Sequence, residues 1–278
     1  MRVAVASGKG GTGKTTVALA LALSLPAAQL VDADAEEPNV HLFLDWEVQE
    51  TIPVTMMAPE VDAASCDGCG RCAEFCQFNA LAVVRQRVLV FRELCHGCGG
   101  CAVVCPQGAI RAVQRRIGEV EVGRASRLRL IQGRLRPGEP SAVRIVQREL
   151  EQLEEGSPVI VDAPPGTACA VQEVMAQADY CLLVTEPTPF GRHDLGMAMD
   201  LCAELKVPCG VVINRSGKRD DLIEEECDRR GVPVLLRISF SRAIAEAYAR
   251  GRPLVDGSPG WRVEFAGLWR RLEKRAAQ

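Results

Sequence analysis

The sequence predicts a doubly wound, mostly parallel α/β sheet with a small α+β domain inserted into it. Three observations lead to this prediction. Short apolar runs alternate with segments of helical length, as in sheets whose two faces are covered by helices. A glycine-rich loop separates the first apolar run from the first helical segment. The middle of the chain breaks the alternation and is rich in cysteine and glycine instead.

The outer regions supply the strands and helices of the sheet domain. Residues 3–6 predict a strand, residues 15–25 predict an Ala- and Leu-rich helix, and a second strand ends at Asp32. The alternation resumes at about residue 141. Further strands are expected at 159–162, 181–184, 210–214 and 232–236, with helices at 141–155, 190–206 and 220–230. Because the N-terminal part alone has too few strands for a stable sheet, we assign both outer regions to one domain.

The middle region contains an internal repeat. Residues 66–81 match residues 95–110 with the same cysteine spacing and a period of 29 residues. The next segment, 117–140, is punctuated by Gly and Arg and predicts a hairpin that returns the chain to the sheet. We therefore expect residues 1–58 and 117–278 to form the sheet domain and residues 59–116 to form the inserted domain.

Composition excludes several classes of protein. Of the 278 residues, 47% are hydrophobic and 25% are charged, as in ordinary folded domains rather than disordered chains. No apolar run approaches the ~20 residues of a membrane helix. The N-terminus lacks the features of an export signal, so we expect a cytoplasmic location. The net charge of −3 gives no indication of nucleic-acid binding, and none is expected.

Residues 8–15 read GKGGTGKT and satisfy the phosphate-loop pattern G-x-x-x-x-G-K-[ST] between a strand and a helix. Glycines let consecutive backbone N–H groups surround phosphates, Lys14 reaches the β- and γ-phosphates, and the Thr15 hydroxyl ligates Mg²⁺. The expected nucleotide contacts in this loop are Gly8, Gly10, Gly11, Thr12, Gly13, Lys14, Thr15 and Thr16. The sequence thus predicts a P-loop NTPase fold.

Eight of the thirteen cysteines lie between Cys66 and Cys105, in two runs of C-x₂-C-x₂-C-x₃-C. This spacing resembles that of bacterial two-cluster ferredoxins, in which the fourth cysteine of each run ligates the cluster of the other run. The first [4Fe-4S] cluster would take Cys66, Cys69, Cys72 and Cys105, and the second would take Cys95, Cys98, Cys101 and Cys76. A pair of structural zinc sites is the alternative, although zinc ligands usually come as separated C-x₂-C pairs. Gln77 stands where the ferredoxin pattern usually has proline.

The second lysine of the phosphate loop, Lys9, gives GKGGTGKT its resemblance to the MinD/ParA/Mrp superfamily of P-loop ATPases, which includes the nitrogenase iron protein. The resemblance implies that ATP is bound and that Lys9 reaches across a nucleotide-sandwich dimer to the phosphates of the partner. It also implies a homodimer, or a heterodimer with a paralogue. A solvated loop lysine is the alternative for Lys9.

Further motifs of this superfamily occur in order along the chain. Asp32 and Asp34 resemble the first switch, which implies that Asp34 orients the attacking water and that Asp32 helps to hold Mg²⁺. Asp162 and Gly166 resemble the second switch, with Asp162 as the Walker B aspartate and Gly166 near the γ-phosphate. Asn214 and Arg215 resemble the segment that reads adenine. Asp and Asn also end strands for reasons of turn geometry, so each motif alone is weak.

The combined motifs resemble an ATPase of this superfamily that carries an inserted ferredoxin-like domain. We expect slow ATP hydrolysis through Lys9, Lys14 and Asp34, stimulated by dimerisation or by a partner. The leading hypothesis is that nucleotide state gates electron transfer from two [4Fe-4S] clusters to a redox partner protein. The alternatives are a metallocofactor carrier like Mrp and a redox-sensing positioning ATPase like MinD.

Three other features have less specific interpretations. Cys169 follows the second switch, where cysteines bridge a cluster between subunits in the nitrogenase iron protein, although free cysteines are usually buried apolar groups. Arginines between 111 and 136 balance anionic clusters or form a docking face for an acidic redox partner. Apolar residues at helical spacing from 261 to 272 predict a terminal helix packed on the sheet, in preference to membrane binding.

Overall fold

In the computed structural model, which describes residues 1–257 and 259–276, nine strands form one sheet. Their order across the sheet is β11-β10-β9-β1-β8-β2-β7-β6-β3. The strands are β1 Arg2–Ala6, β2 Ala28–Asp32, β3 Glu47–Val61, β6 Ile110–Ala125, β7 Leu128–Leu135, β8 Val159–Asp162, β9 Tyr180–Thr185, β10 Cys209–Ser216 and β11 Val234–Ser239. From β11 to β7 all neighbours are parallel, whereas β6 is antiparallel to both β7 and β3. The predicted mostly parallel α/β sheet is confirmed.

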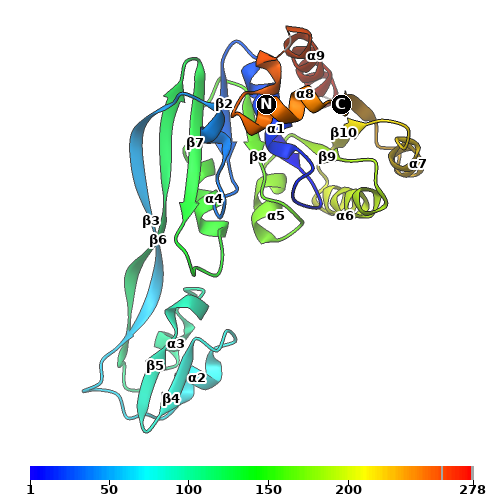
Figure 1. Ribbon diagram of the computed structural model, residues 1–278. Helices are drawn as coiled ribbons and strands as arrows, with labels where there is room; N and C mark the ends of the chain where they lie inside the picture. The colour runs from blue at the N-terminus through cyan, green and yellow to red at the C-terminus, as the bar shows by residue number, and fades with distance from the viewer. Residues whose placement is uncertain (258, 277–278) are drawn as a thin grey trace.

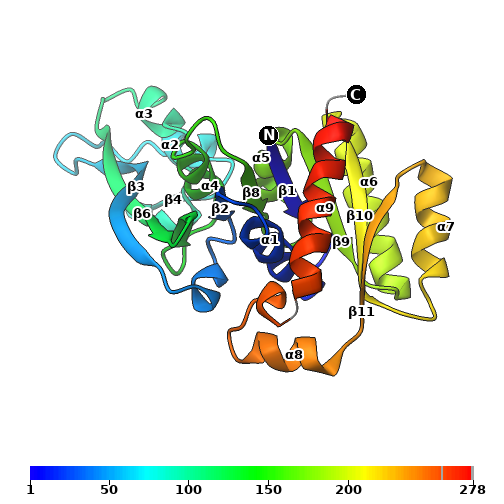
Figure 2. The same cartoon turned by 90° about the horizontal axis from the view of Figure 1, so that it is seen from above.

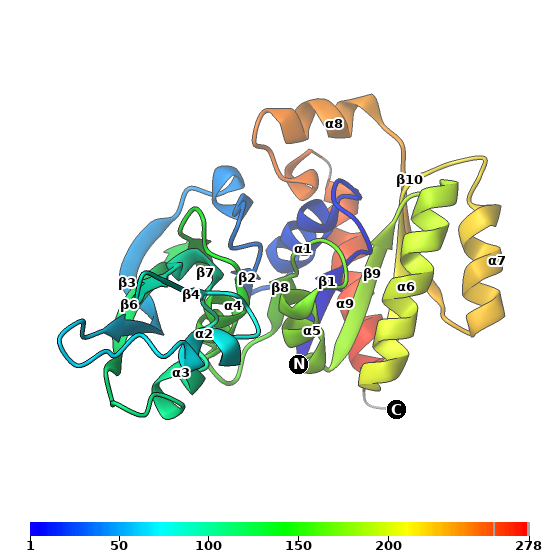
Figure 3. The ribbon, with the colours of Figure 1, turned by 90° about the horizontal axis from the view of Figure 1, so that it is seen from below.

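Helices cover both faces of the parallel part (Figures 2 and 3). They are α1 Lys14–Leu23, α4 Val143–Leu150, α5 Cys169–Ala176, α6 Pro189–Leu205, α7 Asp221–Arg230, α8 Arg242–Ala249 and α9 Pro259–Ala276, with short 3₁₀ helices η1 Val40–Phe43 and η3 Leu254–Asp256. Helices α1 and α9 pack on one face, and α4, α5, α6 and α7 cover the other. Central strands are apolar on both sides because each face is buried, which explains their continuous apolar runs.

The last helix packs on the sheet, as its apolar spacing predicts. Phe265, Leu268 and Leu272 are fully buried in the core that α9 shares with α1. None of the helices within residues 1–257 and 259–276 is long and apolar enough to cross a membrane. Helix α4 begins and ends inside the expected range 141–155, and β11 lies two to three residues further along the chain than expected.

A long antiparallel pair at the edge of the sheet extends away from it (Figure 1). Strands β3 and β6 pair from Glu47↔Arg124 to Val61↔Ile110. Strand β7 pairs with β6 only from Gly118 to Ala125. We call the part beyond β7 the ribbon (residues 55–61 and 110–117). The hairpin expected at 117–140 is present, but its first strand begins at Ile110, and β3 is not predicted from the sequence. The expected domain boundaries, 58/59 and 116/117, both lie in the ribbon.

Residues 62–109 form a small lobe at the end of the ribbon, which we call the cysteine lobe. It contains helices α2 Arg71–Phe75 and α3 Gly100–Val103, strands β4 Leu81–Val84 and β5 Arg87–Val90, and the 3₁₀ helix η2 Arg92–Leu94. Both short helices follow a glycine in the left-handed region, Gly70 and Gly99, at equivalent positions of the repeat. The sequence repeat is therefore a structural repeat.

Candidate functional site

The phosphate loop, residues 8–15, connects the carboxyl end of β1 to α1 and is held closely by its neighbours. A Cβ atom at Gly8 would lie 2.3 Å from the carbonyl oxygen of Asp194 on α6. One at Gly13, whose φ is +94°, would lie 2.2 Å from Nδ2 of Asn214. Glycine is therefore required at both positions, and the loop conformation is fixed by the packing around it.

Asn214 and Arg215, at the carboxyl end of β10, bind the backbone of this loop. The Asn214 amide donates to the carbonyl of Thr12 at 2.8 Å, and the Arg215 guanidinium donates to the carbonyl of Gly11 at 3.4 Å. The structure thus places both residues at the phosphate loop. Adenine reading by Asn214 stays a prediction.

Lys9 is bound within its own chain by Glu186, a residue that the sequence analysis does not identify. Its ammonium lies 2.5 Å from Oε1 of Glu186, and Oε2 of the same carboxylate accepts from Arg215 at 2.8 Å. Burial alone would raise the pKa of Glu186, but Lys9 and Arg215 outweigh it and lower this pKa. Glu186 directly follows the buried strand β9, and this position is the signal in the sequence that could have indicated it.

Three aspartates lie near Lys14 at the carboxyl ends of β2 and β8. Asp32 and Asp162 are direct neighbours on paired strands, and both are buried. Burial, reinforced by the neighbouring carboxylates, raises the pKa of Asp162. Burial also raises the pKa of Asp32, although the N–H groups of Asn39 and Val40 donate to it at 2.8 and 2.9 Å. Burial likewise raises the pKa of Asp34, which is partly exposed to the cleft.

This donor set fits a hydrated Mg²⁺ ion. Oδ1 of Asp162 and Oγ1 of Thr12 are buried and have no hydrogen-bond partner within the described residues. Because unpartnered buried oxygens are costly, such atoms indicate a place for a polar ligand. Oxygen ligands are those that Mg²⁺ prefers, and a divalent cation would allow the clustered carboxylates to ionise.

A cleft of about 490 Å³ lies over the phosphate loop. Lys14, Thr15 and Asp34 line one part of it, and Phe240 and Tyr248 line another. The remaining expected contacts that line it are Gly10, Gly11, Gly13, Thr16, Asn214 and Arg215. Gly166 does not line this cleft; its N–H donates to the carbonyl of Ser7 at 3.1 Å, and its φ is +90°. Phe240 and Tyr248 offer an apolar surface for a base, and no sequence motif indicates them.

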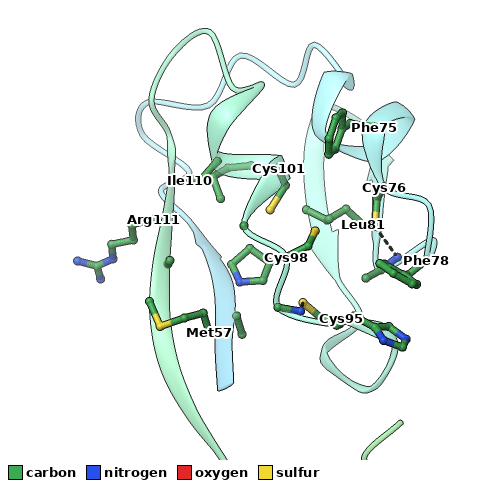
Figure 4. Close-up of a pocket in the computed structure, with 18 residues that line it drawn as sticks. Met57, Phe75, Cys76, Phe78, Leu81, Cys95, Cys98, Cys101, Ile110 and Arg111 are labelled. Carbon is green, nitrogen blue, oxygen red and sulfur yellow. Dashed lines mark hydrogen bonds between the residues drawn. The ribbon is translucent and has the colours of Figure 1, made fainter. Parts of the chain in front are cut away.

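The eight clustered cysteines divide between two cavities of the cysteine lobe. Cys66, Cys69, Cys72 and Cys105 line one of them. Cys76, Cys95, Cys98 and Cys101 line the other, together with Phe75, Phe78 and Ile110 (Figure 4). In each cavity, three cysteines of one run meet the fourth cysteine of the other run. The structure therefore brings together the two sets of residues that the ferredoxin-like spacing groups.

The surroundings of these thiols fit an anionic iron–sulfur group. Backbone N–H groups of Ala80 and Gly97 donate to the sulfurs of Cys76 and Cys95 at 3.3 and 3.4 Å. Burial raises the pKa of the Cys72 and Cys101 thiols, and a bound cation would favour their thiolate forms. Soft thiolate donors in sets of four suit iron–sulfur clusters or zinc.

Two further groups lie outside both sites. Glu149 on α4 is fully buried beside Gly133 of β7, and neither of its carboxylate oxygens has a hydrogen-bond partner in the described chain. Burial, followed by the nearby charge of Asp32, raises its pKa well above the usual value. Cys169, the first residue of α5, is exposed. The sequence gives no signal for Glu149, because an acidic residue on an amphipathic helix normally faces solvent.

The sequence profile of the CobQ/CobB/MinD/ParA nucleotide binding domain family matches residues 3–254. The uncharacterised protein MJ0579 of Methanocaldococcus jannaschii is 29% identical over 92% of this chain and 91% of its own length. MJ0578 of the same organism is 30% identical over 78% and 79% of the two chains. The iron-sulfur cluster carrier protein of Pyrococcus abyssi is 26% identical over 91% and 79%.

Among solved structures, the cell division ATPase MinD of Pyrococcus furiosus matches with a TM-score of 0.58 and 20% sequence identity, over 98% of both chains. The septum site-determining protein MinD of Pyrococcus horikoshii, complexed with Mg-ADP, matches with a TM-score of 0.58 and 18% identity, over 99% of this chain and 96% of the other. At these identities the likeness concerns the fold.

Proposed function

Because the chain belongs to the CobQ/CobB/MinD/ParA nucleotide-binding family, we propose that its nucleotide state controls electron transfer from two [4Fe-4S] clusters to a partner protein. As a member of this family it is a P-loop ATPase. Lys14 and Thr15 hold the phosphates and Mg²⁺, and Asp34, which lines the cleft, orients the attacking water. Lys9 supplies a further positive charge to the phosphates of a paired subunit once it leaves Glu186.

The observation that carries the proposal is the sorting of eight cysteines into two cavities of four at the end of a ribbon. Bound there, the clusters would supply one-electron chemistry. Tetrahedral zinc would require the four sulfurs of a set to converge to about 3.8 Å of one another. Each cavity holds four cysteines, one for each iron of a cubane, and zinc is the alternative that metal analysis of the purified protein distinguishes.

The proposal is tested with anaerobically reduced protein mixed with a redox acceptor protein. We expect oxidation of the iron–sulfur chromophore to accelerate with ATP, and the acceleration to disappear in Lys14→Ala. Cys76→Ser should lose about half of the bound iron, whereas the matched change Cys169→Ser should keep it. An oxidation rate that is the same with and without ATP would contradict electron gating.

A second candidate function is that of a cluster carrier, favoured by the Pyrococcus abyssi relative that bears this name. In both cavities one cysteine is exposed, Cys69 in the first and Cys98 in the second, which would allow an acceptor thiol to approach. Transfer of iron and sulfide to an apo-acceptor, with loss of colour from this chain, would support the carrier function. Retention of the chromophore through repeated ATP turnover would exclude it.

The nucleotide cycle also requires a paired subunit in this proposal. Two relatives from Methanocaldococcus jannaschii match this chain, so paralogous chains of this kind coexist in one organism. Both a homodimer and a heterodimer of paralogues are therefore compatible with the proposal. Sedimentation with a non-hydrolysable ATP analogue, for this chain alone and mixed with a paralogue, distinguishes the two.

A further inference from the structure

Arg115, on the ribbon part of β6, contacts the sheet domain and the cysteine lobe at the same time. Its guanidinium forms a two-pronged ion pair with Glu139, in the loop between β7 and α4; one prong, from Nη2 to Oε2, measures 2.7 Å. Nη2 also donates to the backbone carbonyl of Arg92 in η2, at 3.2 Å. In Figure 1 the loop between β7 and α4 extends toward the cysteine lobe.

This ion pair differs from the other ion pairs of the ribbon in its burial. The side chains of Arg115 and Glu139 are 16% and 7% exposed, whereas those of the adjacent pair Arg116–Glu119 are 50% and 28% exposed. Two charges removed from water must recover the desolvation cost through well-aligned hydrogen bonds, which the planar guanidinium provides. The Arg115–Glu139 contact therefore has one defined geometry.

In the cysteine lobe, Arg115 binds a backbone carbonyl that lies next to Cys95, a predicted cluster ligand. The carbonyl of Arg92 that accepts from Arg115 also accepts from the backbone N–H of Cys95, at 3.2 Å. The sulfur of Cys95 in turn accepts from the N–H of Gly97 and lines the second cavity. A displacement of the guanidinium would thus change the hydrogen bonding of the Cys95 segment directly.

At the other end, the loop that bears Glu139 is linked to the predicted first switch. Ala35 follows Asp34, and its carbonyl accepts from the N–H of Leu135, the last residue of β7, at 2.8 Å. The chain then continues into the loop that bears Glu139. A path of hydrogen bonds and short stretches of chain therefore runs from Asp34 through the β7–α4 loop to Arg115 and on to Cys95.

We propose that Arg115 is a positioning residue that transmits the nucleotide state of the phosphate-loop site to the second set of cysteines, through Glu139 on one side and the Arg92 carbonyl on the other. This inference rests on the proposed function, because it supplies the coupling that gating requires. A shift of the segment after Asp34 moves the β7–α4 loop, and the Arg115–Glu139 pair carries this movement to the backbone that presents Cys95.

The test compares hydrogen exchange of the amides 92–98 in the anaerobic, iron-loaded protein with and without a non-hydrolysable ATP analogue. In the wild type we expect the analogue to change exchange at Cys95 and Gly97 by about threefold or more. Arg115→Lys keeps the charge but loses the two-pronged geometry, and it should abolish this change while the affinity for the analogue stays within about twofold. The matched control is Arg116→Lys, the next residue along β6, which should behave as the wild type.

A second variant separates a positioning role from a structural one. Glu139→Gln lies outside the cysteine lobe and should also abolish the response, and the exchanged pair Arg115→Glu with Glu139→Arg should restore part of it. If the wild type shows no response at 92–98, the proposed gating fails. If the wild type responds and both Arg115→Lys and Glu139→Gln respond equally, this inference alone is overturned. If Arg115→Lys does not retain iron, Glu139→Gln decides between the two outcomes.

Discussion

The phosphate-loop site and the cysteine lobe are both built from glycine-rich turns, but they rest on different supports. Residues such as Val5, Ile160 and Leu182, which are fully buried, make the strands beneath the phosphate loop part of an extensive core. The core of the cysteine lobe consists of Cys72, Ala80, Leu81, Cys95, Cys101 and Ile110. Half of these buried residues are predicted cluster ligands.

This difference indicates which of the two sites is folded in the absence of its ligand. The sheet domain buries enough apolar surface to fold with its nucleotide cleft empty or filled. A lobe of this size has too small a core to be stable without a staple, and its own core residues are the ones that would bind the metal. The nucleotide site is therefore preformed, whereas the cysteine site is expected to fold together with its clusters.

Removal of iron is the strongest test of this comparison. If the lobe holds the proposed clusters, chelation under anaerobic conditions should raise amide exchange of residues 62–109 by about 100-fold or more, because those clusters would hold its core together. Exchange in β1, β8 and β9 should stay unchanged. Hydrogen exchange measured by mass spectrometry resolves the two regions within one sample. A lobe that stays protected without iron would show that the two sites do not differ in this way.

The second prediction perturbs the phosphate-loop site and leaves the cysteine lobe intact, through the substitution Lys14→Ala. It should lower ATP hydrolysis by about 10² to 10³-fold, because a preorganised positive charge at the phosphates is lost. Iron content and protection of the cysteine lobe should not change, since Lys14 lies at the phosphate loop, in the sheet domain. Lys218→Ala, an exposed lysine near the same end of the sheet, is the matched control and should retain activity. Loss of iron from Lys14→Ala would mean that the sites are not independently folded.

The smallest expected effect is on the pH dependence of the stability of the sheet domain, and it comes from Glu149. Its pKa is raised in the folded protein, so the folded state binds one more proton than the unfolded state above about pH 4.5. Stability therefore falls as pH rises from that value toward the folded pKa, by up to about 1.4 kcal/mol per pH unit. Glu149→Gln removes this dependence, and its advantage over the wild type should grow as the pH rises above about 4.5.

Urea unfolding of the sheet domain at several pH values measures this difference. Glu151→Gln, an exposed position just after α4, is the control and should give a constant offset from the wild type. A constant offset for Glu149→Gln as well would show that its carboxyl group is ionised in the folded protein.

The sequence alone predicts those parts whose pattern is local. Continuous apolar runs indicated the parallel strands, and the phosphate loop was placed correctly because its glycines and Lys14 are close together along the chain. The grouping of Cys76 with Cys95, Cys98 and Cys101 joins the two runs, and it is predicted only through the resemblance of their spacing to that of two-cluster ferredoxins.

Features that depend on tertiary contacts could not be predicted in this way. The pairing of Glu186 with Lys9 joins residues far apart in the chain, and the burial of Glu149 depends on the absence of a side chain at Gly133. Strand β3 alternates polar residues with Ile52, Val54 and Met56, a period of two that indicates a strand with one buried face. The sequence does not predict β3, because no turn signal precedes this alternation. Its pairing partner, β6, follows only after the whole cysteine lobe.

The ribbon contains one residue more on β6 than on β3 at the point where it leaves the sheet. Val54 pairs with Gly118 and Thr55 pairs with Arg116, so Ile117 is an unmatched, buried residue between them. Side chains alternate between faces along a strand, and one extra residue exchanges the faces of everything beyond it. This bulge puts Arg115 opposite Met56, on the face toward α4, rather than on the reverse side. In a regular ladder that kept Ile117, Arg116 would lie opposite Met56 and Arg115 would point away from Glu139, so the bulge decides which of two adjacent arginines reaches the loop between β7 and α4.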